Sequence, residues 1–236
     1  MNSNPQDGTS VKKYGLALHT ASRELGLAIS NFAGDSRCQT WNLDRDLATH
    51  LHQYLVEFIQ PQNWGDLAFI AVAKGPGGFT GTRMGMVTAR TLAQQLDIPV
   101  FAVSTLAAVA WAEPPLTKGL LELEPPQPPL AKGGLLREDI ALQMPAQRGQ
   151  LFGAVYSVNK DSGLTELFPE TVMTPESWQE KLDNWGNSYQ LIEVGSELGW
   201  SVSSVLELAY LEWKMGSRPD WSEALPFYGQ HPVKGH

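Results

Sequence analysis

A glycine-rich loop is the strongest candidate for a ligand-binding site in this sequence. The loop, residues 74–78, follows an apolar run at 69–73 and precedes a helix-compatible run at 80–96. Its glycines allow positive φ angles and a close approach of the backbone, and Thr80 or Thr82 could cap the helix. N–H groups that face outward at a helix N-terminus attract anions. The pattern predicts a strand, a loop and a helix, and phosphate binding is one use of such a loop.

The same loop has a purely structural interpretation as a tight turn from strand to helix. It lacks the Lys and the following Ser or Thr of a P-loop, and Thr80 stands where a dinucleotide-binding fingerprint has its third glycine. We take the turn as the first interpretation of Gly75, Gly77 and Gly78, and phosphate binding as the second.

Other reactive side chains do not form a recognisable site in the sequence. His50 and His52 are two apart on a predicted helix, so they lie on different faces, and no His-Glu-x-x-His motif occurs. No Gly-x-Ser-x-Gly nucleophile motif occurs either. Cys38 is the only cysteine, which excludes an internal disulfide and a multi-cysteine zinc site. We expect no catalytic residue and no metal site in this chain.

The composition favours a protein partner over a nucleic acid. The chain has 236 residues, with 17 Lys and Arg against 25 Asp and Glu, and a formal net charge of −8. Non-specific affinity for RNA or DNA comes mainly from Lys and Arg that neutralise phosphates, so we do not expect this chain to bind RNA or DNA on its own. The first residues lack the apolar core of a signal peptide, and no apolar run approaches the roughly 18 residues of a membrane span. We expect a cytoplasmic protein without membrane contact.

The first half of the chain predicts a mixed sheet with helices packed on it. Two strands joined by a tight hairpin and a third strand come first. Apolar residues at helical spacing then indicate an amphipathic helix that ends before Pro61, and βαβ crossovers follow, in the order βββαβαβ. The expected elements are strands at 14–19, 25–31 and 37–42, a helix from 43, a strand at 69–73, a helix at 80–96 and a strand at 100–103.

The second half repeats this order in shorter form, βββαβα. Between the halves, residues 113–138 carry a proline-rich repeat that cannot be the interior of a helix or a central strand. We interpret it as a low-complexity insertion, with a peptide-docking segment as the alternative. The expected elements are strands at 140–144, 151–158 and 164–172, a helix after Pro175, a strand at 189–194 and a helix at 202–215.

The domain prediction follows from these patterns. We divide the chain into a disordered lead-in at 1–12, a first lobe at 13–112, the insertion at 113–138, and a second lobe with a C-terminal tail at 139–236. Two α/β lobes of this order, side by side, resemble the actin-like (ribonuclease H-like) architecture of the actin-like and sugar-kinase-like ATPases.

Three stretches carry a resemblance to one family. LALHTASRELGLAIS, AVAKGPGGFTGTRMGM followed by TLAQQLDIPVFAVSTL, and PAQRGQLFGAVYS together resemble the bacterial TsaB family, also called YeaZ. The GPGGFTGTR loop with its flanking strands is specific to that family and its catalytic relatives. The resemblance implies a protein that is not the catalyst but pairs with TsaD, which transfers a threonylcarbamoyl group to adenosine 37 of tRNAs. An ATPase, TsaE, and an enzyme that makes threonylcarbamoyl-AMP serve the same pathway.

The sequence departs from the superfamily where ATP would be bound. The resemblance implies an aspartate at the end of the first strand, and His19 stands there. Imidazole does not replace a hard carboxylate ligand for magnesium. The aspartate of the family's DARMGEVY pattern corresponds to Pro145, and a histidine usual in the first helix corresponds to Leu47. The resemblance therefore implies ATP and metal on the TsaD partner, with no cofactor required by this chain. A vestigial nucleotide or phosphate contact would involve His19, Thr20, Gly77, Gly78 and Thr80.

The helix after the glycine loop carries a stripe of small residues that would let another backbone come close. Gly81, Gly85 and Ala89 recur every four positions, and packing against the chain's own sheet is the alternative explanation. Family members pair with TsaD, or with themselves, through their first two helices, so the resemblance implies a partner interface here. That interface would contain Leu47, Leu51, Leu55, Gly81, Arg83, Gly85 and Ala89.

Three functions are compatible with the sequence. The first is a non-catalytic subunit that binds and activates a TsaD-like transferase, in a complex that also holds a TsaE-like ATPase. The second is an autonomous ATP-dependent phosphotransferase or ATPase of the same fold. The third is a self-associating adaptor, since a homodimer would use the same helices.

Overall fold

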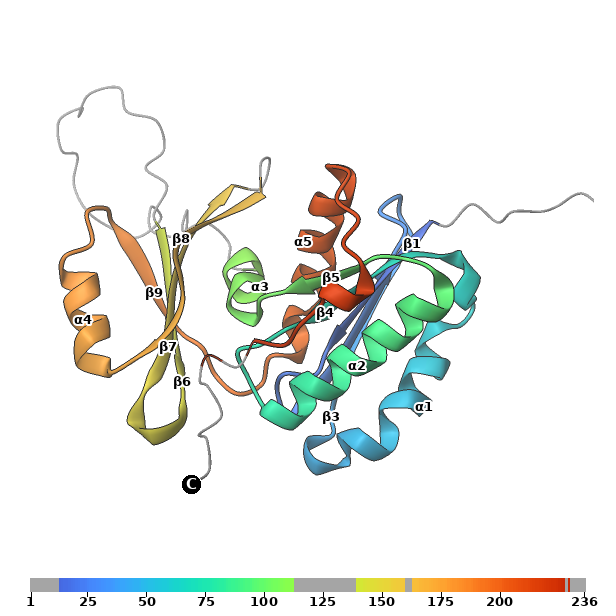
Figure 1. The fold of residues 1–236 in the computed structure, drawn as a ribbon, viewed down its shortest axis with the longest axis horizontal. Helices are drawn as coiled ribbons and strands as arrows, with labels where there is room; N and C mark the ends of the chain where they lie inside the picture. The colour runs from blue at the N-terminus through green and yellow to red at the C-terminus, as the bar shows by residue number, and fades with distance from the viewer. Residues whose placement is uncertain (1–12, 113–138, 160–162, 228, 230–236) are drawn as a thin grey trace, which may run out of the picture.

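Two mixed β-sheets and the helices that cover them build the molecule in layers (Figure 1). The computed structural model describes residues 13–112, 139–159, 163–227 and 229. The predicted lead-in and the proline-rich insertion lie outside these residues. In chain order the strands and α-helices are β1 (Tyr14–His19), β2 (Glu24–Ser30), β3 (Ser36–Asn42), α1 (Leu47–Ile59), β4 (Leu67–Ala73), α2 (Phe79–Leu96), β5 (Val100–Val103), α3 (Thr105–Ala112), β6 (Asp139–Pro145), β7 (Leu151–Asn159), β8 (Gly163–Met173), α4 (Pro175–Asp183), β9 (Tyr189–Glu193) and α5 (Val202–Lys214).

Both sheets combine hairpins with parallel crossovers. The first has the strand order β3-β2-β1-β4-β5, with β1 antiparallel to β2 and parallel to β4. The second has the order β8-β7-β6-β9, with β6 antiparallel to β7 and parallel to β9. The prediction of an α/β fold with mixed sheets is confirmed, and the observed order of strands and α-helices is βββαβαβα followed by βββαβα, one helix more than predicted.

One helix of the described chain, α3, was not predicted. Its sequence TLAAVAWA is apolar or small throughout, and residues 105–111 are all buried. A helix that is buried on every side shows no amphipathic period, so its pattern could not be separated from the strand before it.

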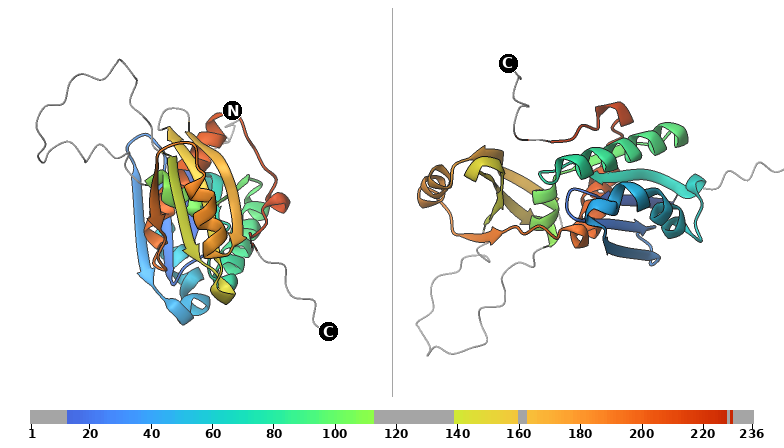
Figure 2. Two further views of the ribbon diagram at one scale, coloured as in Figure 1. Left: turned by 90° about the vertical axis from the view of Figure 1, so that its left-hand side faces the viewer. Right: turned by 90° about the horizontal axis from the view of Figure 1, so that it is seen from below.

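Three hydrophobic clusters fill the spaces between the layers. The outer face of the first sheet packs on α1 and α2. The outer face of the second sheet packs on α4. The middle cluster joins both sheets through α3 and α5, with Phe69 and Phe101 from the first sheet and Leu142 and Tyr156 from the second. Figure 2 shows α4, in orange, at one end of the molecule and α1 and α2 at the other.

Helix α5 follows the second sheet along the chain but packs against the first. It contacts β1, β2 and β4, as well as α3. Chain order would place α5 in the second lobe, 139–236, whereas its contacts place it on the first sheet. The part of the chain that the structure describes contains no helix long and apolar enough to cross a membrane.

Candidate functional site

The glycine loop between β4 and α2 is pressed against the turn between β1 and β2. The Gly78 N–H donates to the Ala21 carbonyl at 2.7 Å, and Thr105 N–H donates to the Gly75 carbonyl at 2.8 Å. A Cβ atom on Gly77 would lie 2.1 Å from the Ala21 carbonyl oxygen. Glycine is therefore required here by a close contact within the chain.

The prediction that Thr80 or Thr82 caps α2 is wrong. The helix begins one residue earlier, at Phe79, with Gly78 as its N-cap and no side-chain capping bond. The hydroxyl of Thr82 instead donates back to the Gly78 carbonyl at 2.9 Å. Thr80 is exposed.

His19 lies at the carboxyl end of β1, fully buried. Neither ring nitrogen has a hydrogen-bond partner among the residues that the structure describes. Burial disfavours the charged imidazolium and lowers the pKa of His19 to about 4. Because a buried, neutral imidazole cannot act as a hard anionic ligand, His19 does not fit a magnesium site.

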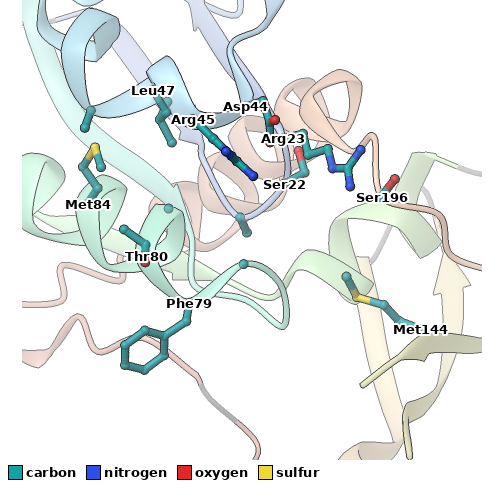
Figure 3. Close-up of a pocket in the computed structure, with 14 residues that line it drawn as sticks. Ser22, Arg23, Asp44, Arg45, Leu47, Phe79, Thr80, Met84, Met144 and Ser196 are labelled. Atoms are coloured by element: carbon teal, nitrogen blue, oxygen red, sulfur yellow. The ribbon is translucent and has the colours of Figure 1, made fainter. Parts of the chain in front are cut away.

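A cavity of about 570 Å³ opens beside the loop, between the first lobe and the second sheet. Arg23 and Arg45 line it from the first lobe, and Met144 of β6 and Ser196 line it from the other side (Figure 3). The ring of Phe79 points away from the other labelled residues. Among the described residues that line the cavity, Asp44 is the single carboxylate.

The residues around this cavity do not fit a magnesium-nucleotide complex. The Gly78 N–H donates to the Ala21 carbonyl, and the Thr20 hydroxyl donates to the Gly81 carbonyl at 2.8 Å. Pro145, where the family pattern has an aspartate, pairs with Leu151 at the end of β6. The structure thus brings the five residues expected at a vestigial phosphate site together around one turn, but the Gly78 N–H and the Thr20 hydroxyl are used within the chain.

The small-residue stripe of α2 faces the chain's own β1–β2 turn. A Cβ atom on Gly85 would lie 2.1 Å from Thr20 Oγ1, and one on Gly81 would lie 2.1 Å from the Thr20 carbonyl oxygen. Ala89 is fully buried. Gly81 and Gly85 thus make their close contact within the chain, and a partner interface at these three residues stays a prediction.

The leucine stripe of α1 is also internal. Leu47, Leu51 and Leu55 are between 0% and 5% exposed and pack in the cluster between the first sheet and its two covering helices. They are not available to a partner in this conformation. Of the interface residues predicted from the sequence, Arg83 is exposed, with its guanidinium 4.4 Å from the centre of the Phe79 ring.

The solvent side of α1 and α2 presents a different set of residues, which we call the α1–α2 face. Val56 is 54% exposed and Val87 is 63% exposed. The two helices meet at the cavity, where Ala48 and Met84 both contribute to its lining. The α1–α2 face consists of Ala48, His52 and Val56 on α1 and Arg83, Met84 and Val87 on α2.

Sequence reasoning missed the α1 side of this face, although the signal was present. Ala48, His52 and Val56 follow the leucine stripe by one position each, so they lie about 100° further around α1. An apolar valine at an exposed helical position was the available indication.

Comparisons with known proteins agree with this fold. A family described as "TsaD: tRNA N6-adenosine threonylcarbamoyltransferase" matches residues 50–134. The chain is 34% identical over 117 residues to the tRNA threonylcarbamoyladenosine biosynthesis protein TsaB of Bacillus subtilis, a match that covers 50% of this chain and 42% of that protein. It is 27% identical over 152 residues to TsaB of Buchnera aphidicola from Acyrthosiphon pisum, covering 64% of this chain and 61% of the relative. The chain thus spans about half the length of the curated relatives it matches.

A solved structure of YeaZ from Pseudomonas aeruginosa shares the fold. It superposes with a TM-score of 0.67 at 21% identity, over 91% of this chain and 99% of that one. A second structure, described as an uncharacterized protein with similarity to peptidase YEAZ from the same organism, gives a TM-score of 0.68 at 20% identity, over 92% and 99% of the two chains. The chain is thus similar in sequence to proteins named TsaB and shares the two-sheet fold of solved structures named YeaZ.

Proposed function

We propose that this chain is a non-catalytic, cytoplasmic subunit that binds a TsaD-like transferase through the α1–α2 face. The observation that carries the proposal is the exposure of Val56 and Val87 on neighbouring helices whose inner stripes are fully used by the core. A contiguous exposed apolar patch would mark a protein-binding site, and we place these two valines in one such patch. Relatives named for tRNA threonylcarbamoyladenosine biosynthesis support the pathway.

The match to the TsaD family itself supports this choice of partner. It begins within α1 and includes all of α2. Two related chains that present equivalent helices can meet in a self-complementary arrangement, as two copies of one chain do in a symmetric dimer. A homodimer through the α1–α2 face is the competing assembly, and a TsaE-like ATPase would join the complex through the partner.

In this proposal the α1–α2 face activates the transferase by binding it and supplies no catalytic group. A subunit that binds the active conformation of the transferase more tightly than its inactive conformation shifts the population toward the active one. Arg83 at the edge of the face would lie near the partner. ATP and metal belong to the transferase in this proposal, and tRNA contacts this chain only indirectly.

Titration calorimetry with the TsaD-like subunit of the same organism tests the interface. Val87→Asp buries an unpaired charge in the contact, so we expect affinity to fall by about 30-fold or more, corresponding to roughly 2 kcal/mol. Leu167→Asp is the matched control, because Leu167 is 40% exposed on β8 and lies outside the α1–α2 face. Circular dichroism checks that both variants fold. Equal affinities for wild type and Val87→Asp, or equal losses in both variants, would reject the interface.

The alternative, an autonomous ATPase, has no specific observation in its favour. The Gly78 N–H and the Thr20 hydroxyl donate within the chain, and His19 is buried and neutral. Calorimetry with ATP and magnesium distinguishes the two functions. Tight binding with hydrolysis by the isolated chain would replace the scaffold role with an enzymatic one.

A further inference from the structure

A polar cluster joins the second sheet to the start of α3. Ser104, between β5 and α3, donates its hydroxyl hydrogen to Oε1 of Glu170 on β8. The Tyr156 hydroxyl on β7 donates to the same oxygen at 3.3 Å. Ser104 Oγ also accepts the Ala107 N–H at 3.0 Å, so it closes the first turn of α3. One carboxyl group of the second sheet therefore holds the residue that caps a helix of the other lobe.

The same junction is tied to the glycine loop. Thr105 follows Ser104 directly, and its N–H donates to the Gly75 carbonyl at 2.8 Å. The Lys74 N–H donates to the Val103 carbonyl, also at 2.8 Å. Glu170 is thus connected to the loop that precedes α2 by its hydrogen bond with Ser104, by the peptide bond from Ser104 to Thr105, and by the hydrogen bond from Thr105 to Gly75.

The charged groups around Glu170 come from three elements. Lys74 lies on the loop after β4, and its positive charge acts on both Glu170 and Glu212 of α5. Glu166, on β8, is the nearby group of like charge. Helix α3 itself contributes no ionisable side chain, since its sequence is TLAAVAWA.

We propose that Glu170 is a proton-dependent latch that fastens the second sheet to the start of α3 and, through Thr105, to the glycine loop. In the protonated form the carboxyl keeps its acceptor oxygen for Ser104 and Tyr156 without placing a charge in the interface. In the ionised form the same contact holds a buried negative charge, which the charge of Lys74 and the hydrogen bond from Tyr156 offset in part.

The titration of Glu170 sets the pH range of this device. Burial raises the pKa of Glu170 to about 8, and Lys74 opposes part of that rise. In an open state, exposed to water, the pKa returns toward its ordinary value near 4.5. The closed state therefore holds more protons between these two values. The latch is fully favoured below the lower pKa and weakens as the pH rises through about 8.

Hydrogen exchange at the Ala107 N–H of the full chain tests the latch. After correction for the intrinsic rate, we expect exchange in the wild type to rise about tenfold or more between pH 5.5 and pH 8.5, the change produced by one unit of pKa difference between the closed and open states. Glu170→Gln keeps an acceptor oxygen but cannot ionise, so its corrected rate should be the same at both pH values. Glu166→Gln is the matched control on the same strand; it removes a minor like charge and should keep the rise in rate with pH.

Three outcomes would overturn the proposal. They are a wild-type rate that does not change with pH, a Glu170→Gln rate that rises as the wild type does, and a Glu166→Gln rate that loses the dependence. If Glu170→Gln does not fold, Ser104→Ala decides instead. It removes the linking hydroxyl and should give rapid Ala107 exchange at both pH values, whereas unchanged protection would contradict the latch.

Discussion

Single residues show why the glycines of this chain are needed. Gly77, Gly81 and Gly85 all approach the β1–β2 turn so closely that a Cβ atom would overlap Ala21 or Thr20. A small-residue stripe at a spacing of four can admit either a partner helix or the chain's own backbone. The sequence could not distinguish the two, because the answer depends on where Thr20, far away along the chain, lies in space.

Gly85→Ala should destabilise the fold. The new Cβ would lie 2.1 Å from Thr20 Oγ1, so that α2 or the turn must move. We expect a loss of about 1–3 kcal/mol in the free energy of unfolding, measured by urea denaturation. Gly78→Ala is the control, since the nearest atom would be 3.7 Å away, an ordinary contact. A Gly85→Ala protein as stable as Gly78→Ala would show that the packing described here is wrong.

His19 should make the fold sensitive to acid. Its pKa is lowered to about 4 in the folded chain and is near 6.5 when unfolded, so the unfolded state binds more protons between these values. Stability is therefore present above about pH 6.5 and is lost as the pH falls toward 4, by up to about 1.4 kcal/mol per pH unit. His19→Leu removes the titrating group and should flatten this dependence in urea denaturation. An unchanged slope in the variant would assign the acid sensitivity to other groups.

At the scale of elements, α1 is anchored at its C-terminus by a side chain from β3. Arg37 Nη2 donates to the carbonyls of Phe58, Ile59 and Gln60 at 2.8, 3.0 and 2.8 Å. These carbonyls belong to the last turn of the helix and its cap, which have no partner within the helix. A basic side chain there also interacts favourably with the helix dipole.

Arg37→Met should weaken this anchor while it keeps an apolar stem. We expect about 1–2 kcal/mol less stability and faster hydrogen exchange in the last turn of α1. Gln39→Met, two residues along the same strand and exposed, should change neither quantity. Similar exchange in both variants would mean that the three carbonyl bonds do not hold the helix.

Most elements could be predicted because their residues follow the period of one structure. The short apolar runs of β1, β2 and β7 are buried at most positions, and the helical spacing in α1 reflects one buried face. Helix α3 was not predicted, because it is buried on all sides and shows no amphipathic period. The individual residues on the α1 side of the α1–α2 face could not be predicted, because exposed Val56 directly follows buried Leu55 in the sequence.

At the scale of the whole molecule, the two sheets share a core. The middle hydrophobic cluster contains residues of both sheets together with α3 and α5, so neither lobe buries its inner face alone. Sequence order suggested a division at the insertion, but it could not reveal that α5 returns to the first sheet. That return depends on contacts between residues far apart in the chain.

Leu106→Ala should therefore loosen both sheets together. Leu106 is fully buried on α3, in the cluster that joins them. We expect a loss of about 2–5 kcal/mol, with hydrogen exchange rising in β4 and β7 alike. Leu182→Ala, in the separate cluster under α4, should raise exchange in the second sheet and spare β4. If Leu106→Ala left either sheet fully protected, the shared core would not be one cooperative unit.

A mixing assay for threonylcarbamoylated tRNA tests directly whether this chain activates the transferase. The TsaD-like subunit of the same organism, the enzyme that makes threonylcarbamoyl-AMP, the TsaE-like ATPase, ATP and tRNA are combined with and without this chain. We expect that adding the chain raises product formation about fivefold or more. Val87→Asp should abolish the stimulation and Leu167→Asp should retain it. Equal product formation with and without the wild-type chain would contradict the proposed role.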